Sequence, residues 1–235
     1  KRIDVTDKSL REFLDTPPYA EDTRSKIDQI GVVNGLAWTE VGGELLEVEA
    51  GVMDGTGKLE LTGNLGQVMQ ESVKAAYTCL RSRAAELGIA PDFYKTKDIH
   101  VHFPEGAVPK DGPSAGIAIA TAMLSALTGR AVRHDVAMTG EVTLRGRVLP
   151  IGGLREKTMA AKRSGIRTVI IPRGNEKDLA DIDPAVREAL RFITAETVDA
   201  VFAHALTLPK KEATVEHLAV MGSPAMQEVR HGDQL

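Results

Sequence analysis

The apolar positions along this chain follow two different spacings, and the spacing changes at turns that are rich in glycine. From residue 31 onward, short runs rich in β-branched and apolar residues predict strands. These runs lie at 32–39, 45–50, 58–62, 99–103, 136–139, 142–149, 168–172 and 191–194. Segments with an apolar residue at every third or fourth position predict helices. These segments lie at 64–87, 115–127, 154–164, 176–190 and 197–206.

Glycines mark the ends of three of the expected helices, because glycine readily adopts the left-handed conformation that closes a helix. Gly88, Gly129 and Gly165 hold these positions. The segment 115–127 is apolar nearly all round, which predicts a helix buried on every side. Strands and helices interleave irregularly, so the predicted class is α/β, or α+β, with a mixed sheet.

The polar and charged ends of the chain predict three parts. Residues 1–30 are charged and contain the breaker Thr16-Pro17-Pro18, which suggests the end of a preceding domain and a linker. Residues 31–208 carry the regular pattern of a folded domain. Residues 209–235 turn polar and suggest a loose tail. Since the chain opens within a pattern and without methionine, we interpret it as a fragment of a longer protein.

Composition excludes several classes of partner and compartment. The 235 residues are 43% hydrophobic with a net charge of −4, so no basic surface for nucleic acid is indicated. There is no run of about 18–20 apolar residues that would span a bilayer, and no apolar leader at the start. The single cysteine, Cys79, fits a reducing compartment, and its helical pattern predicts a packed thiol.

Ser114 lies among small residues at the start of the buried helix, in Gly112-Pro113-Ser114-Ala115-Gly116. It could simply cap that helix, but Ile117 stands where a capping box would place Glu or Gln. We expect Asp111 to be the cap, with Ser114 one turn into the helix. Free N–H groups and the helix dipole favour a negative charge there, so an oxyanion could be held.

The same residues also fit G-x-S-x-G, the nucleophile elbow of α/β-hydrolases. An elbow follows a strand directly, whereas Pro104 and Pro109 separate Phe103 from Ser114. The hydrolase alternative is therefore weaker, although residue type leaves it open, because four histidines follow the serine: His134, His204, His217 and His231.

Lys157 stands out among the lysines because none of its neighbours on the predicted helix is charged. Those neighbours are Gly153, Leu154, Ala160 and Ala161. Desolvation would lower the lysine pKa from ~10.4 to ~7–8, which makes a usable general base at neutral pH. A serine activated by a lysine needs no histidine. If Ser114 and Lys157 meet in space, the chain is a peptidase.

Three further features have a functional and a structural interpretation. Thr139 follows a buried strand and could hold the lysine amine, or it could be an ordinary strand threonine. His100 and His102 share one strand face and could bind a metal, but no third strong ligand is evident, so we favour hydrogen-bonded structural histidines. Residues 51–58 fail the spacing G-x-x-x-x-G-K-[ST], so a turn is indicated and no nucleotide site is visible.

Together these motifs resemble the proteolytic domain of Lon, the ATP-dependent protease of the AAA+ class. The resemblance covers nearly the whole chain, and it is gapless around the serine. The motifs that carry it are Gly35-Leu36-Ala37-Trp38-Thr39, Gly66-Gln67-Val68-Met69-Gln70-Glu71-Ser72, His100-Val101-His102, Lys110-Asp111-Gly112-Pro113-Ser114-Ala115-Gly116, Met138-Thr139-Gly140-Glu141 and Pro150-Ile151-Gly152-Gly153-Leu154 to Lys157.

The resemblance implies a catalytic dyad in a Ser–Lys endopeptidase. Ser114 would attack the scissile carbonyl, Lys157 would take its proton, and Thr139 would orient the lysine. Asp111 would tune the dyad or block it in a resting state. Backbone N–H groups around Gly112 and Ser114 would bind the oxyanion.

The resemblance also implies a substrate groove and partners. Trp38, Glu40 and Pro113 would line the groove, where a peptide adds as an extra strand. The substrates would be unfolded, damaged or degron-bearing regulatory proteins. Residues 1–30 would end the small helical subdomain of an AAA+ module, and ATP and Mg²⁺ would bind only in that module. This fragment would need no cofactor and no metal. We expect a homohexamer without a membrane partner, in the bacterial cytoplasm rather than the mitochondrial matrix.

An alternative function is that of a non-catalytic relative of the same fold, which serves as an oligomerisation platform. Such relatives tend to lack the serine. The presence of both Ser114 and Lys157 argues against that interpretation.

Overall fold

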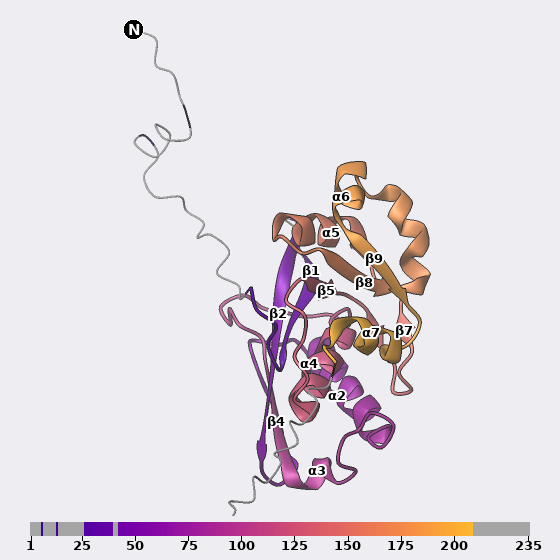
Figure 1. Cartoon of the computed structure of the whole chain (residues 1–235). Coiled ribbons are helices and arrows are strands. Elements are labelled where there is room, and N and C mark those ends of the chain that lie inside the picture. Colours follow the sequence, from indigo (N-terminus) through magenta and orange to yellow (C-terminus); the bar gives the residue numbers. More distant parts are fainter. Residues whose placement is uncertain (1–5, 7–12, 14–25, 40–41, 209–235) are drawn as a thin grey trace, which may run out of the picture.

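A mixed sheet forms the centre of the protein (Figure 1). The structure, a computed structural model, describes residues 6, 13, 26–39 and 42–208. Within these residues the sheet has seven strands in the order β3-β4-β2-β1-β5-β8-β9. They are β1 (Val32–Thr39), β2 (Gly42–Asp54), β3 (Leu59–Thr62), β4 (Lys97–His102), β5 (Val136–Met138), β8 (Thr168–Pro172) and β9 (Arg191–Ala195). The β1–β2 and β2–β4 pairs are antiparallel, and the other pairs are parallel. The predicted α/β class with a mixed sheet is confirmed.

Helices cover both faces of the sheet and create two cores. Helices α2 (Gln67–Ser82), α4 (Gly116–Thr128) and α7 (Val198–Ala205) belong to the larger core (Figure 1). Helices α5 (Leu154–Arg163) and α6 (Pro184–Ala189) belong to the smaller core on the opposite face. The 3₁₀ segment η1 (Arg173–Asp181) precedes α6, and the short α3 (Phe93–Thr96) precedes β4.

Helix α4 is the buried helix that the sequence predicts. Every residue from Gly116 to Ser125 is buried. Each fully buried Ile or Leu stabilises the fold by about 1.5–3 kcal/mol, so α4 anchors the larger core. Gly129 ends the helix with φ of 68°, the left-handed cap expected from the sequence.

Several predicted elements are wrong in their extent. The strand expected at 45–50 is the longer β2, and the helix expected at 176–190 is the 3₁₀ segment η1 followed by α6. The segment 142–149 is a hairpin and not one strand, since β6 (Glu141–Val142) and β7 (Val148–Leu149) pair with each other. Gly146, with φ of 80°, lies in the turn between them. Helix α2 ends at Ser82 instead of residue 87. Arg83 follows it, and its guanidinium donates to the Asp199 carboxylate at 2.8 Å, a long-range contact that the local pattern does not reveal.

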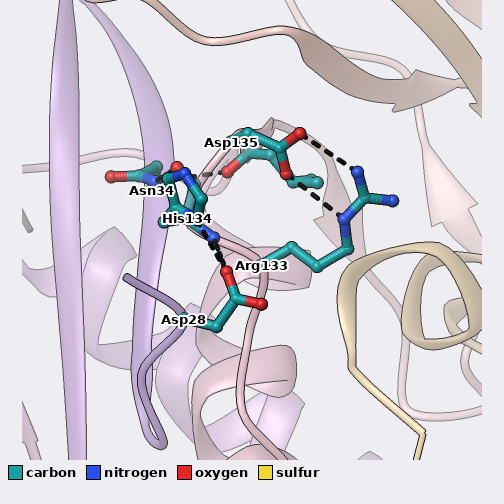
Figure 2. Close-up of polar contacts among 6 residues, drawn as sticks. Asp28, Asn34, Arg133, His134 and Asp135 are labelled. Carbon is teal, nitrogen blue, oxygen red and sulfur yellow. Dashed lines mark hydrogen bonds and ion pairs between the residues drawn. The ribbon is translucent and has the colours of Figure 1, made fainter. Parts of the chain in front are cut away.

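A polar network fastens the start of β5 to β1 (Figure 2). The Oδ1 atom of Asp28 accepts from the backbone N–H of His134 at 3.0 Å and lies 2.7 Å from its Nδ1. The same N–H holds the pKa of Asp28 below its ordinary value. The Asn34 amide donates to the carbonyls of His134 and Val136 at 3.1 and 3.3 Å. These bonds fix the strand that ends next to Thr139.

Two further features are the environment of Cys79 and the apolar character of the helices. Cys79 is fully buried, and burial raises the pKa of its thiol, so the packed thiol is confirmed. Among the residues that the structure describes, no helix combines the length and the apolar character needed to cross a membrane.

Candidate active site

A cavity of about 590 Å³ lies where β1 and β5 separate. Strand β1 pairs with β5 only through Asn34 and Gly35, so the residues that follow in β1 border open space on that side. The walls come from the end of β1 and the paired start of β2, from α2, from the loop before α4, and from α5 with the loop before it. The lining residues are Ala37, Trp38, Thr39, Glu44, Leu46, Met69, Pro109, Lys110, Asp111, Pro113, Ser114, Pro150, Ile151, Gly152, Gly153 and Lys157.

Ser114 lies in a turn just before α4. We expected it one turn into the helix, so that placement is wrong. Helix α4 begins at Gly116, whose N–H donates to Pro113 O at 3.1 Å. The carbonyl of Ser114 accepts from Gly140 N at 2.7 Å, which fastens the turn to the segment after β5. Its hydroxyl makes no hydrogen bond to any described residue, so Oγ is free to face a substrate in the cavity.

Lys157 projects from the first turns of α5 into the same cavity. Only 2% of the residue is exposed, and Leu154, Ala160 and Ala161 beside it are buried too, as the sequence predicts. Burial lowers the pKa of Lys157 from 10.5 to about 8, because a buried ammonium loses its hydration. About a tenth of the amine is therefore neutral at pH 7, and a neutral amine is a base.

Thr139 joins the lysine to the serine loop. Its hydroxyl accepts from Lys157 Nζ at 3.2 Å and donates to the carbonyl of Ser114 at 3.2 Å. The residue is completely buried at the end of β5, and its N–H donates to Ile170 O at 3.1 Å. Because the hydroxyl proton is used on Ser114 O, Lys157 must donate one N–H to Thr139. The lone pair of the neutral amine then remains available for another proton.

Ser114 and Lys157 line one cavity but do not hydrogen-bond to each other in this structure. Nucleophile and base are often further apart in an unliganded site than in the reacting complex. A small rotation of the Ser114 side chain is a low-barrier movement between staggered rotamers. The main chain of Ser114 and the amine of Lys157 are therefore already in place, and only the Ser114 side chain has to rotate.

Asp111 caps a different helix from the one that we expected. Its Oδ1 accepts from Met69 N at 2.8 Å, at the third residue of α2, and from Gly112 N at 2.9 Å. Gly66 precedes α2 because a Cβ there would lie 2.3 Å from the Asp111 carboxyl carbon. The predicted cap of α4 is therefore wrong. In this structure Lys157 is bonded to Thr139 and not diverted to Asp111.

Of the backbone donors expected for an oxyanion, Gly112 N–H is engaged and Ser114 N–H is not engaged by any described residue. The Gly112 N–H is engaged by Asp111. In the described part of the chain, the N–H groups of Ser114 and Ala115 have no acceptor. These two donors lie at the N-terminal end of α4, where the helix dipole adds positive potential. They are the better candidates for holding a negative oxygen.

Trp38 forms one rim of the cavity. It is 57% exposed, and it packs against Gly153, where an added Cβ would lie 2.9 Å from Trp38 Cβ. Gly153 also has φ of 69° and caps α5, so no other residue type fits without strain. Pro113 lines the same cavity. Glu40, the other expected groove residue, lies outside the described residues.

The histidines do not belong to this site. His100 Nε2 and His102 Nδ1 lie 2.8 and 2.6 Å from the hydroxyl of Thr62. The expectation of hydrogen-bonded structural histidines is confirmed. Among the described residues, no cluster of three or more histidine, cysteine or acidic side chains could hold a metal ion.

Eleven of the lining residues were not among the predicted site residues, and Glu44, Met69, Lys110 and Ile151 are four of them. Glu44 could have been found from strand register, since it lies opposite Ala37 in the β1–β2 pair. Lys110 is nearly buried, and its ammonium donates to the carbonyls of Glu105 and Val108 at 2.7 and 3.1 Å. Lys110 belongs to one of the motifs that carry the resemblance, but its contacts could not be predicted, because its acceptors are main-chain atoms.

Comparison with known proteins gives a consistent result. The model of the Lon protease (S16) C-terminal proteolytic domain matches residues 4–208. The Lon protease of Brevibacillus choshinensis is 58% identical over 207 residues, which cover 88% of this chain and 27% of that protein. Lon protease 1 of Bacillus subtilis is 57% identical over 211 residues, 90% of this chain and 27% of that protein.

A third relative is similar to the same degree. Lon protease 1 of Myxococcus xanthus is 58% identical over 210 residues, which cover 89% of this chain and 26% of that protein. The chain thus spans about a quarter of the length of these relatives.

Proposed function

The chain belongs to the Lon protease family, and from that premise we propose that it hydrolyses peptide bonds as a serine endopeptidase with a Ser114–Lys157 dyad. The observation that carries the proposal is Lys157 itself. It is buried, its pKa is lowered to about 8, and Thr139 holds its amine in the cavity that Ser114 lines. A lysine in that state is a general base at the pH of most cells.

The first half of the reaction forms an ester between substrate and enzyme. The neutral Lys157 amine takes the proton of Ser114 Oγ as that oxygen attacks the scissile carbonyl carbon. The carbonyl oxygen becomes an oxyanion and accepts hydrogen bonds from Ser114 N–H and Ala115 N–H. The tetrahedral intermediate then collapses, the C–N bond breaks, and Lys157 passes its proton to the leaving amine.

The second half releases the acyl group by hydrolysis. Lys157, neutral again, takes a proton from a water molecule, and the resulting oxygen nucleophile attacks the ester carbon. Collapse of the second tetrahedral intermediate breaks the bond to Ser114 Oγ, and the proton on Lys157 returns to that oxygen. The same amine therefore serves as base and acid in both halves, and Thr139 keeps it in place throughout.

The free side of β1 is the place where we expect the substrate main chain to bind. Beyond Gly35, β1 has no strand partner on its β5 side among the described residues, and Ala37, Trp38 and Thr39 face the cavity there. An extended peptide could add to this edge through main-chain hydrogen bonds. Such hydrogen bonds involve the main chain of the substrate and not its side chains, which suits an enzyme that cleaves many unfolded sequences.

The wider biology is part of the same proposal. Named relatives about four times longer support an ATPase module elsewhere in the full protein, which would bind ATP and Mg²⁺. The substrates would be unfolded, damaged or degron-bearing proteins, and the assembly a homohexamer. The bacterial sources of the relatives support the cytoplasm as its location. The division of the chain at residues 30 and 208 stays a prediction.

The test is cleavage of an unfolded protein such as casein, without ATP, by the wild type, Ser114→Ala and Lys157→Ala. We expect cleavage by the wild type alone, and the circular dichroism spectra of both variants should match it. A peptide boronate, which forms an adduct only with a competent nucleophile, should label the wild type and not Ser114→Ala.

Two outcomes would contradict the proposal. Cleavage by Ser114→Ala at the wild-type rate would remove the serine from the chemistry. A wild type that neither cleaves nor forms the boronate adduct would favour the non-catalytic oligomerisation platform.

A further inference from the structure

A second cavity of about 330 Å³ adjoins the first. It lies between the β6–β7 hairpin, the start of η1 and the segment that leads into α7. Pro150 lines both cavities, so they are neighbours across a single residue. Gly174 allows this close arrangement, because a Cβ there would lie 2.5 Å from Pro150 Cγ. The loop that carries Pro150 also forms a wall of the active-site cavity.

Arg147 in this second cavity has a fixed main chain and an uncommitted side chain. Its N–H donates to Thr143 Oγ1 at 3.0 Å, and its carbonyl accepts from Thr143 N at 3.0 Å. It also forms a bridge to Thr197. In contrast, its guanidinium has no hydrogen-bond or ion-pair partner among the described residues. The main chain of Arg147 is therefore held by the hairpin, while its guanidinium makes no bond to a described residue.

Among the charged residues that line the second cavity, Arg173 forms ion pairs and Arg147 does not. Arg173 lies 3.1 Å from the Glu176 carboxylate and 4.0 Å from that of Glu196. Glu196 is the acidic residue among the lining side chains, so its charge is partly shared with Arg173. Arg147 makes no ion pair with any described residue, and two arginines and one glutamate give the cavity lining a net positive charge. The planar guanidinium of arginine fits a carboxylate through two parallel hydrogen bonds.

The geometry along the chain puts Arg147 within reach of a bound substrate. Pro150 lies three positions after Arg147, so their Cα atoms are at most about 10 Å apart. An extended peptide advances about 3.3 Å per residue. A polypeptide that leaves the active-site cavity over Pro150 therefore reaches Arg147 within about three residues.

We propose that the second cavity is a subsite that receives an acidic side chain of the polypeptide bound in the active-site cavity, and that Arg147 recognises its carboxylate. The inference rests on the proposed endopeptidase function and adds a specificity to it. Peptides with Glu or Asp a few residues to one side of the scissile bond are then better substrates than their amide counterparts.

The test compares matched peptides that differ by one charge. A single Glu is moved through four positions on each side of one scissile bond, and each peptide has a Gln counterpart. Both ends are blocked, so that only the side chain supplies a carboxylate. We expect the wild type to prefer Glu about fivefold in kcat/KM at one or two adjacent positions, the ratio that corresponds to about 1 kcal/mol. Added salt should reduce the ratio.

Variants assign the preference to Arg147. Arg147→Gln should bring the Glu-to-Gln ratio to one, and Arg147→Glu should favour a Lys peptide instead. Arg145→Gln is the matched control, because Arg145 is exposed on the same turn but does not line the cavity. It should keep the wild-type ratio.

The outcomes distinguish a failure of the subsite from a failure of the proposed endopeptidase function. Cleavage without any charge preference, or a preference that Arg147→Gln retains, would overturn the subsite and leave the endopeptidase intact. A wild type that cleaves none of the peptides would overturn the proposed function, and the subsite with it.

Discussion

Thr139 shows how much of the site depends on a single hydroxyl. One oxygen accepts from the base and donates to the main chain of the nucleophile, so the positions of Lys157 and Ser114 are linked through it. The sequence allowed two interpretations of this threonine, and the two bonds favour the functional one. The sequence could not decide, because both partners come from other parts of the chain.

Thr139→Val keeps the shape of this side chain and removes both hydrogen bonds. We expect kcat for a short peptide to fall by about 100-fold, because a misplaced base loses most of its contribution. KM should change little. Thr139→Ser restores the hydroxyl and should recover most of the activity, whereas equal losses in the two variants would contradict the role of the hydroxyl.

Lys157 is also expected to make the fold less stable. Its amine takes up a proton below about pH 8 when folded and below about 10.5 when unfolded. Unfolding therefore binds a proton between these values, and the free energy of unfolding rises with pH across that window. Below about pH 8 the cost is complete, at about 3 kcal/mol for the charged state.

Lys157→Met removes the buried charge and should raise the free energy of unfolding at pH 7 by about 1–2 kcal/mol while abolishing activity. The gain is smaller than the full cost, because Thr139 loses its donor. Urea denaturation at pH 7 and pH 10 measures this, and the difference between variant and wild type should shrink at pH 10. A variant that is less stable than the wild type at pH 7 would contradict the account.

At the scale of elements, the N-terminus of α2 and the loop before Ser114 stabilise each other. Asp111 supplies the cap that α2 lacks in its own sequence, since Gly66 has no side chain. The loop is held in turn by Gly66 N–H, which donates to Lys110 O at 2.8 Å. The start of one helix thereby sets the path of the chain toward the start of another.

Asp111→Ala should cost about 1 kcal/mol of stability, the usual loss for a missing cap, and should also lower activity. Asp183→Ala is the control, because Asp183 caps α6 through Ala185 N at 2.8 Å and lies far along the chain from the cavity lining. It should cost similar stability and leave kcat/KM unchanged. Thermal unfolding and peptide cleavage measure the two effects, and a parallel loss of activity in both variants would contradict a local role of Asp111.

Periodicity predicted most elements well where burial and pattern agree. Helix α4 is apolar all round and closed by glycine, so its ends were found to within a residue. The cap of α2 could not be found, because Asp111 reaches it from 42 positions away. The hairpin of β6 and β7 was missed because its two strands are very short and were read as one segment, although Gly146 between them was a signal for a turn.

The helices next to the proposed nucleophile and the proposed base pack on opposite faces of one sheet. Ser114 is attached to α4 in the larger core, and Lys157 belongs to α5, which packs in the smaller core. Thr139 follows β5, the strand between them. Both cores must therefore be formed before the dyad exists, and the motifs that predicted the residues could not predict this division.

The 235-residue chain shows no phosphate-binding loop of the P-loop type, so we expect its cleavage of casein to be the same with and without ATP. A stably folded substrate should stay intact, since it exposes an unfolded chain only rarely. The measurement is the rate of fragment release from casein and from a folded protein of similar size. Stimulation of either rate by ATP would contradict this expectation.

The most direct test of the central claim is the pH dependence of kcat/KM for a short unstructured peptide. If neutral Lys157 activates Ser114, kcat/KM should rise about tenfold per pH unit below about pH 8 and level off above it. Lys157→Arg, whose guanidinium stays protonated, should be inactive throughout. A flat profile between pH 6 and 9, or the same profile in Lys157→Arg, would contradict the lysine as the base.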